Sequence, residues 1–221
     1  MTLPKIMTVY GTRPEAIKVA ALLAELQNDP RFESIPVSTG QHREMLAQVN
    51  EMFGIEPRHD LGLMKPGQSL NELVSRALSG LDEIIAREEP DVIVSQGDTS
   101  TAMAAALAGF NRGVKVVHVE AGLRTGDITS PFPEEANRRL ISQVAALHLA
   151  PTAGSRENLL REGFSAEDIV VTGWTPHWKF ARFDLKYLED PQGVVEGEDA
   201  DEPVLLIDDR QDDEAFVGGA A

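Results

Sequence analysis

The chain has 221 residues, a net charge of −16 and no cysteine, and 42% of its residues are hydrophobic. Its length suits one large domain, and its composition is typical of a globular protein with a sizeable core. The acidic balance disfavours nucleic acid and anionic membranes, and the lack of cysteine excludes disulfides and cysteine-based zinc sites. Without a signal-peptide pattern or an apolar run of membrane-spanning length, we expect a soluble, cytoplasmic protein.

Apolar runs of strand length alternate with amphipathic stretches of helix length along most of the chain. We expect strands over residues 5–10, 34–39, 91–96, 114–119, 147–150 and 168–172. We expect helices over residues 14–28, 41–53, 69–89, 99–111, 134–144 and 155–162. The stretch 54–67 is expected to be irregular. This alternation predicts an α/β protein with a Rossmann-like, mostly parallel sheet and helices on both faces.

The sequence changes character after residue 173. Net charge is −7 over residues 1–173 and −9 over residues 174–221, where acidic runs replace the apolar period. Only the run 204–207 has the composition of a strand there. We expect a Rossmann-like domain over 1–173 and an acidic, irregular, poorly ordered tail over 174–221.

A long loop separates the expected strand 114–119 from the helix 134–144. It opens with Glu120 and contains Arg124, and the helix that follows begins with the acidic residue Glu134. Long loops with many charged groups are commonly functional, and the alternative is an acidic surface connection.

Charged and polar clusters directly follow four of the expected strands. In a parallel sheet the carboxyl ends of the strands share one edge, where ligands bind. We therefore expect Arg13, His42, Asp98 and Glu120 to face one cleft, with the long loop bringing Glu134 over the same edge.

The residue types in this predicted cleft suit a phosphorylated ligand and proton transfer. Arg13 and the N-terminus of the first helix suit a phosphate, and Lys18 adds a positive charge. The carboxylates of Asp98, Glu120 and Glu134 can transfer protons or stabilise a sugar-like cation.

Each of these assignments has a structural alternative. Arg13 could form a salt bridge with Glu15 at the start of the helix. Asp98 could be only a helix N-cap, and Glu134 could be only an acid in a first helical turn.

Motifs of other protein classes are missing. There is no G-x-G dinucleotide fingerprint, no P-loop and no G-x-S-x-G elbow. The tripeptide HVE at 118–120 resembles the H-x-E of zinc deaminases, whose cysteine ligands this chain lacks. His118 and His148 lie in apolar strands and are expected to be structural. We predict neither a metal site nor a cofactor.

Seven segments match one enzyme family in order and spacing. They are GTRPE at 11–15, QHREML at 41–46, PGQ at 66–68, GDT at 97–99, HVEAGLRT at 118–125, SPFPEEANR at 130–138 and VTG at 171–173. Over about residues 4–173 the sequence thereby resembles the non-hydrolysing UDP-N-acetylglucosamine 2-epimerases.

The resemblance implies the N-terminal half of a GT-B-like fold, in which two Rossmann-like domains enclose the active site. It implies an isomerase that interconverts UDP-N-acetylglucosamine and UDP-N-acetylmannosamine by eliminating UDP and adding it back. It also implies a place in cell-envelope polysaccharide biosynthesis and, as in other family members, a homodimer.

The resemblance assigns roles to residues of the predicted cleft. The family's catalytic carboxylates match Asp98, Glu120 and Glu134. Its basic substrate-binding residues match Arg13 and Lys18.

Other positions match a second site or depart from the family. Gln41 and His42 match a stretch that lines a possible regulatory UDP-sugar site. Ser95 and Gln96 stand where the family often has Val-His. The family's second domain, which supplies a catalytic histidine and most of the nucleotide pocket, is not recognisable after residue 173.

We therefore expect a truncated form of the enzyme with weak or no activity. One alternative is a non-catalytic UDP-sugar-binding or interaction module. A further alternative, half of a GT-B glycosyltransferase, is disfavoured by the segments 118–125 and 130–138.

Overall fold

The computed structural model describes residues 2–40 and 43–173, which form a seven-stranded, fully parallel sheet in the order β3-β2-β1-β4-β5-β6-β7. The strands are β1 (Lys5–Tyr10), β2 (Glu33–Ser38), β3 (His59–Asp60), β4 (Val92–Gln96), β5 (Lys115–Val119), β6 (Leu147–Ala150) and β7 (Ile169–Val171). The helices are α1 (Arg13–Asn28), α2 (Arg43–Phe53), α3 (Leu70–Glu88), α4 (Ser100–Asn111), α5 (Glu134–Val144) and α6 (Ala153–Arg161). A short 3-10 turn, Ala166–Asp168, precedes β7.

The expected α/β, Rossmann-like fold is confirmed, with helices on both faces of the sheet. One strand was missed: β3 lies inside the stretch 54–67, which was expected to be irregular. It has two residues, too few to show an apolar period, and it exists through pairing with Val37 and Ser38 of β2. The tail predicted over 174–221 lies outside the described residues.

Side-chain caps mark where the helices begin. Thr12 and Glu15 form a reciprocal capping box at the start of α1, and Ser69 and Glu72 do the same at α3. Thr99 caps α4 by accepting a hydrogen bond from a backbone N–H of the first turn. Such caps each stabilise a helix by about 1 kcal/mol and set its first residue.

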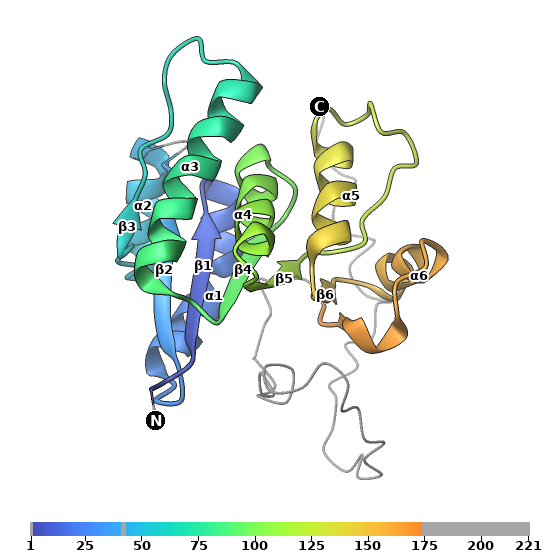
Figure 1. Cartoon of the computed structure of the whole chain (residues 1–221), viewed down its shortest axis with the longest axis horizontal. Helices are drawn as coiled ribbons and strands as arrows, with labels where there is room; N and C mark the ends of the chain where they lie inside the picture. Colours follow the sequence, from blue (N-terminus) through green and yellow to red (C-terminus); the bar gives the residue numbers. More distant parts are fainter. Residues whose placement is uncertain (1, 41–42, 174–221) are drawn as a thin grey trace, which may run out of the picture.

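The sheet is buried between two helical layers (Figure 1). On one face, Leu22 and Leu26 of α1 pack in a core cluster with Val94 of β4. On the other face, Leu81 of α3 packs in a second cluster with Ile93 of β4. Neighbouring residues of a strand point to opposite faces, so β4 contributes to both cores. Figure 1 shows α3, α4 and α5 side by side on the second face.

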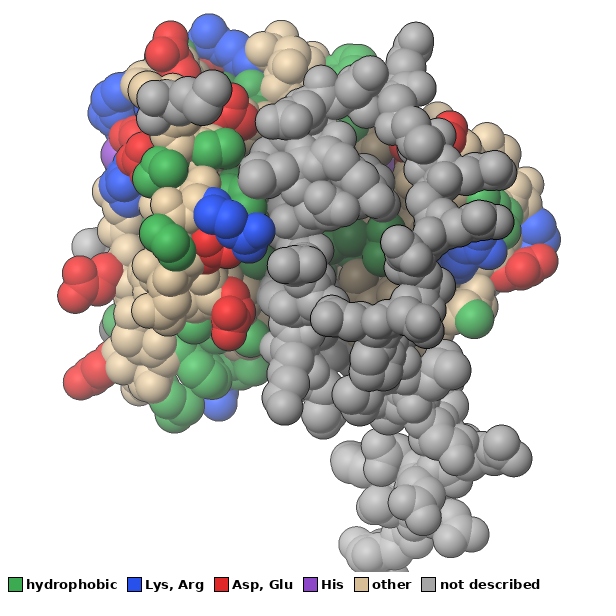
Figure 2. Space-filling view, turned by 90° about the horizontal axis from the view of Figure 1, so that it is seen from below, with side chains coloured by type: hydrophobic (Ala, Val, Ile, Leu, Met, Phe, Trp, Pro, Cys, Tyr) green, Lys and Arg blue, Asp and Glu red, His purple; other side chains and the backbone are tan. Residues whose placement is uncertain are grey.

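The surface seen from below carries both signs of charge. In Figure 2, acidic and basic side chains of the described residues lie interspersed, with hydrophobic side chains between them. Interspersed charges are typical of a solvated protein surface. None of the helices in the described part of the chain combines the length and the apolar composition of a membrane span.

Candidate active site

A cavity of about 430 Å³ lies at the carboxyl ends of β1, β4 and β5. The strand order reverses direction between β1 and β4: β2 and β3 lie on one side of this pair, and β5, β6 and β7 lie on the other. Open parallel sheets bind ligands at the position where the strand order reverses. The lining residues come from the segments that follow these strands and from α5: Thr12, Pro14, Glu15, Lys18, Gln96, Gly97, Asp98, Thr99, Glu120, Leu123 and Arg138. Three carboxylates and two cations are among them, so a bound ligand meets both signs of charge.

Glu120 directly follows β5 and has a positive φ of 68°. This left-handed conformation costs a non-glycine residue about 1–3 kcal/mol, and residues held in it cluster at active sites. Both carboxylate oxygens of Glu120 lie 2.6 Å from Nζ of Lys18, and Gln96 donates a further hydrogen bond to Oε2. The side chain of Glu120 is 6% exposed, so Lys18 compensates a largely buried charge.

Asp98 follows β4 and is held by the first turns of α5. Nε of Arg138 donates to Oδ2 of Asp98 at 2.8 Å, and Nη2 lies 2.6 Å from the same oxygen. The Asn137 side chain donates to the backbone carbonyl of Asp98 at 2.8 Å. The N-cap of α4 is Thr99 and not Asp98, because the Thr99 hydroxyl accepts from the N–H of Ala102. The structural alternative for Asp98 is therefore wrong.

Two buried histidines lie behind the cavity on neighbouring strands. His118 of β5 pairs in register with His148 of β6, and Nε2 of His118 donates to the carbonyl of Gly97 at 2.8 Å. Burial lowers the pKa of His118 to about 3 and that of His148 to about 4. Both imidazoles are therefore neutral near pH 7, which agrees with their expected structural role. Within residues 2–40 and 43–173, no three His, Asp or Glu side chains are grouped to hold a metal ion.

The side chain of Glu15 forms hydrogen bonds with both the segment that follows β1 and the segment that follows β4. Its Oε2 accepts from the N–H groups of Gly11 at 2.6 Å and Thr12 at 2.8 Å, and its Oε1 accepts from the Thr99 hydroxyl at 2.7 Å. Burial raises the pKa of Glu15, and these hydrogen bonds oppose that shift. Glu15 therefore bonds to backbone N–H groups and not to Arg13, so the salt-bridge alternative for Arg13 is wrong.

This arrangement occupies backbone donors at the start of α1, where a phosphate is expected from the sequence. The N–H groups of Gly11 and Thr12 are already bonded to Glu15, whose own N–H is bonded to the Thr12 hydroxyl. A carboxylate at this position also repels an anion.

The structure brings three of the predicted site residues into the cavity and leaves two outside its lining. Lys18, Asp98 and Glu120 line it. Arg13 is exposed in the first turn of α1, and Glu134 is half-buried at the first residue of α5. Neither of them is among the lining residues.

Three lining residues with a charged or amide side chain are absent from the predicted site: Glu15, Gln96 and Arg138. Arg138 had a detectable signal, because it lies four residues after Glu134 and so on the same face of α5. Gln96 is the last residue of β4, at the sheet edge where the cleft was predicted. Glu15 belongs to the segment GTRPE at 11–15, where an acid suits the positive end of a helix, and that pattern does not indicate a residue of the cleft.

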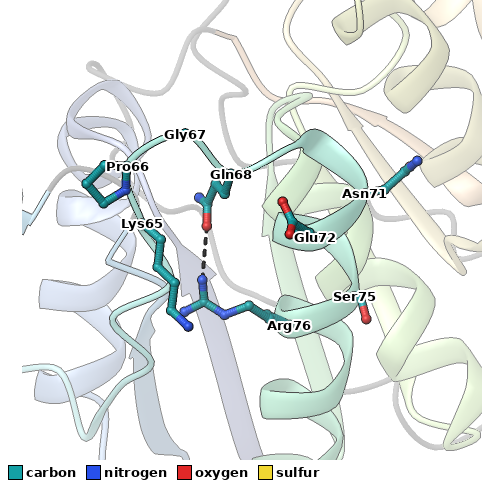
Figure 3. A pocket seen from close by; sticks show the side chains of 8 residues that line it. All are labelled: Lys65, Pro66, Gly67, Gln68, Asn71, Glu72, Ser75 and Arg76. Carbon is teal, nitrogen blue, oxygen red and sulfur yellow. Dashed lines mark hydrogen bonds between the residues drawn. The ribbon is translucent and has the colours of Figure 1, made fainter.

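A second hollow, of about 460 Å³, lies between the loop before α3 and the first turns of that helix (Figure 3). Nη1 of Arg76 donates to Oε1 of Gln68 at 2.9 Å, and Lys65 extends toward Arg76 from the loop. The predicted regulatory-site residues Gln41 and His42 lie outside the described residues.

Comparison with known proteins points to one family. A family model described as UDP-N-acetylglucosamine 2-epimerase matches residues 24–205. The UDP-N-acetylglucosamine 2-epimerase of Salmonella typhimurium is 54% identical over 171 residues, which are 77% of this chain and 46% of that protein. A crystal structure of the Neisseria meningitidis UDP-GlcNAc 2-epimerase bound to UDP-GlcNAc has a TM-score of 0.76 at 47% identity, covering 78% of this chain and 46% of that one.

A more distant likeness concerns the fold alone. The apo form of the lipopolysaccharide outer core galactosyltransferase WaaB has a TM-score of 0.55 at 14% identity, covering 76% of this chain and 45% of that one. This chain spans about half the length of the relatives it matches.

Proposed function

The chain belongs to the UDP-N-acetylglucosamine 2-epimerase family, and on that premise we propose that its cavity forms part of a site that interconverts UDP-N-acetylglucosamine and UDP-N-acetylmannosamine. One observation carries the proposal. Asp98 and Glu120 follow the neighbouring strands β4 and β5, line one cavity, and are each held by one cation.

The proposed reaction removes the proton from C2 of the sugar and breaks the bond between C1 and the UDP oxygen. The electron pair of the C2–H bond forms the double bond of a 2-acetamidoglucal, and UDP leaves with the pair of the C1–O bond. UDP then adds back, and a proton is delivered to the other face of C2. Such a reaction needs acid–base groups that serve both faces, which two separately held carboxylates suit.

We assign the proton transfers to Asp98 and Glu120, with Glu134 as a third carboxylate at the start of α5. Lys18 compensates the charge of Glu120, and a diphosphate would compete for Lys18. In the sequence, Arg13 lies between Thr12 and Pro14, which both line the cavity, and its side chain is exposed. This position supports phosphate binding at the rim of the cavity.

The 221-residue chain by itself is proposed to bind the nucleotide sugar weakly and to epimerise it slowly. Holding a substrate in register with its catalytic groups is worth about 7–11 kcal/mol of the barrier. The residues that the structure describes form one Rossmann-like unit, and a cavity lined by that unit alone leaves much of a nucleotide sugar in water. Water also weakens the effect of each carboxylate on a developing sugar cation.

Incubation with UDP-N-acetylglucosamine in deuterated water tests the proposal, with NMR following both binding and the C2 proton. We expect weak binding and slow deuterium incorporation at C2 that both Asp98→Asn and Glu120→Gln abolish. Asp82→Asn is the matched control, because Asp82 pairs with Arg112 on the surface and does not line the cavity. Absence of any binding to the wild-type chain would contradict the proposal.

The same experiment addresses the alternative of a non-catalytic UDP-sugar-binding module. Binding that is unaccompanied by C2 exchange, even after prolonged incubation, would support it over catalysis.

A further inference from the structure

The two carboxylate oxygens of Asp98 have different environments. Oδ2 accepts a hydrogen bond from Nε of Arg138 at 2.8 Å and lies 2.6 Å from Nη2 of the same residue. Oδ1 has no hydrogen-bond partner among the described residues. A carboxylate held by a planar guanidinium through one oxygen is fixed in orientation while its other oxygen stays available.

Arg138 is in turn held by Glu135, which is fully buried. The Glu135 side chain is 0% exposed, and its Oε2 lies 3.2 Å from Nη1 of Arg138 and accepts from the N–H of Thr125 at 3.2 Å. Its Oε1 accepts from Nε of Arg139 at 3.0 Å. Burial by itself would raise the pKa of Glu135, but the hydrogen bonds from Thr125, Arg139 and Arg138 outweigh it and lower the pKa. Glu135 is therefore a buried anion with three donors.

Stabilisation of helix α5 does not account for this arrangement. Glu135 and Arg139 are spaced as an ordinary i,i+4 pair, and such pairs contribute about 0.3–0.5 kcal/mol on an exposed helix surface. Burying the carboxylate costs several kcal/mol before its partners compensate. The buried position is explained by Arg138, whose side chain is 13% exposed and reaches from Glu135 to Asp98.

We infer that Arg138 is a positioning residue for Asp98, and that Glu135 holds Arg138 in the geometry that leaves Oδ1 of Asp98 open to a ligand. The inference deepens the proposed function and rests on it, since Asp98 is the group proposed to act on the sugar. Partners of this kind orient the groups that touch the substrate. Asn137 assists by fixing the backbone of Asp98.

The test measures the exchange of the Nε–H proton of Arg138 with water, by NMR on the full chain. In the wild type this proton is bonded to Asp98 and should exchange slowly. Glu135→Gln should speed the exchange about tenfold, as expected when a hydrogen bond between charged groups is weakened. Arg139→Met is the matched control, because Arg139 binds Glu135 but not Asp98. This variant should leave the exchange rate of the Arg138 Nε–H proton unchanged.

The outcomes separate this inference from the proposed function. Unchanged Nε–H exchange in Glu135→Gln, or fast exchange in the wild type, would overturn the positioning role. If Glu135→Gln does not fold, Glu135→Asp takes its place, since the shortened side chain keeps the charge but withdraws from Arg138. A titration with UDP-N-acetylglucosamine that shows no binding would overturn the proposed function, while the exchange result still decides whether Arg138 is held by Glu135.

Discussion

Acid should destabilise this protein through the two histidines behind the cavity, before most carboxylates are protonated. Burial lowers the pKa of His118 to about 3 and that of His148 to about 4. In the unfolded chain both groups titrate near pH 6.5. Between these values the unfolded state binds protons that the folded state does not, so stability falls as the pH drops from about 6.5 toward 4.

The loss can be estimated for the step from pH 7 to pH 5. With an unfolded pKa of about 6.5 and a neutral folded form, each histidine contributes a loss of about 2 kcal/mol over this range. The folded protein leaves both rings neutral at pH 5, so the two histidines together should lower the free energy of unfolding by about 4 kcal/mol. That is a large share of the stability of a typical domain.

Urea denaturation at pH 7 and at pH 5 measures this loss, and the reference is the double variant His118→Gln/His148→Leu. Glutamine keeps a donor for the carbonyl of Gly97, and leucine suits a buried site beside Phe164. Carboxylates that also titrate between pH 7 and pH 5 change the free energy of unfolding of both proteins equally, so their contribution cancels in the comparison. If the wild type and the double variant lose the same free energy between the two pH values, the assignment of neutral buried histidines is refuted.

Two further substitutions test the close approach of segments and the charge pairing in the cavity. Gly122→Ala should cost about 2–4 kcal/mol of stability, because its Cβ would lie 2.2 Å from the backbone oxygen of Ser155 at a φ of 85°. Thermal unfolding checks this against Gly54→Ala, where φ is also positive but no atom lies within 4 Å; equal losses would contradict the predicted clash. Glu120→Gln should tighten the binding of UDP about threefold by freeing Lys18, as seen by NMR titration; weaker binding would show that Lys18 does not meet the phosphates.

Local sequence signals determined the secondary structure apart from β3 and placed most of its boundaries within one residue. The apolar runs predicted β1 and β6 to the residue, and the helical pattern predicted α5 to the residue. These features depend on neighbours within a few positions, so a single sequence carries them. The parallel order of the sheet also followed from the alternation of elements, and with it the edge at which Asp98 and Glu120 meet.

Only the tertiary structure decided how the charges of the site are paired. Lys18 and Glu120 are 102 positions apart, and the bond from Thr99 to Glu15 spans 84 positions. Nothing in either local sequence specifies which cation meets which carboxylate, because that depends on which strands are neighbours and on the face of each helix that meets the sheet. The same holds for β3, whose two residues form a strand only because β2 offers an open edge.

The buried charge of Glu135 is the clearest case. In the sequence it is the second acid of a pair at the start of a helix, equivalent to Glu134 beside it. One helical position turns its side chain by about 100°, from a half-buried site to a fully buried one between Arg138 and Arg139. The sequence alone therefore identified the acidic helix start, and the packing of α5 against the segment after β4 decided which of the two acids supports Asp98.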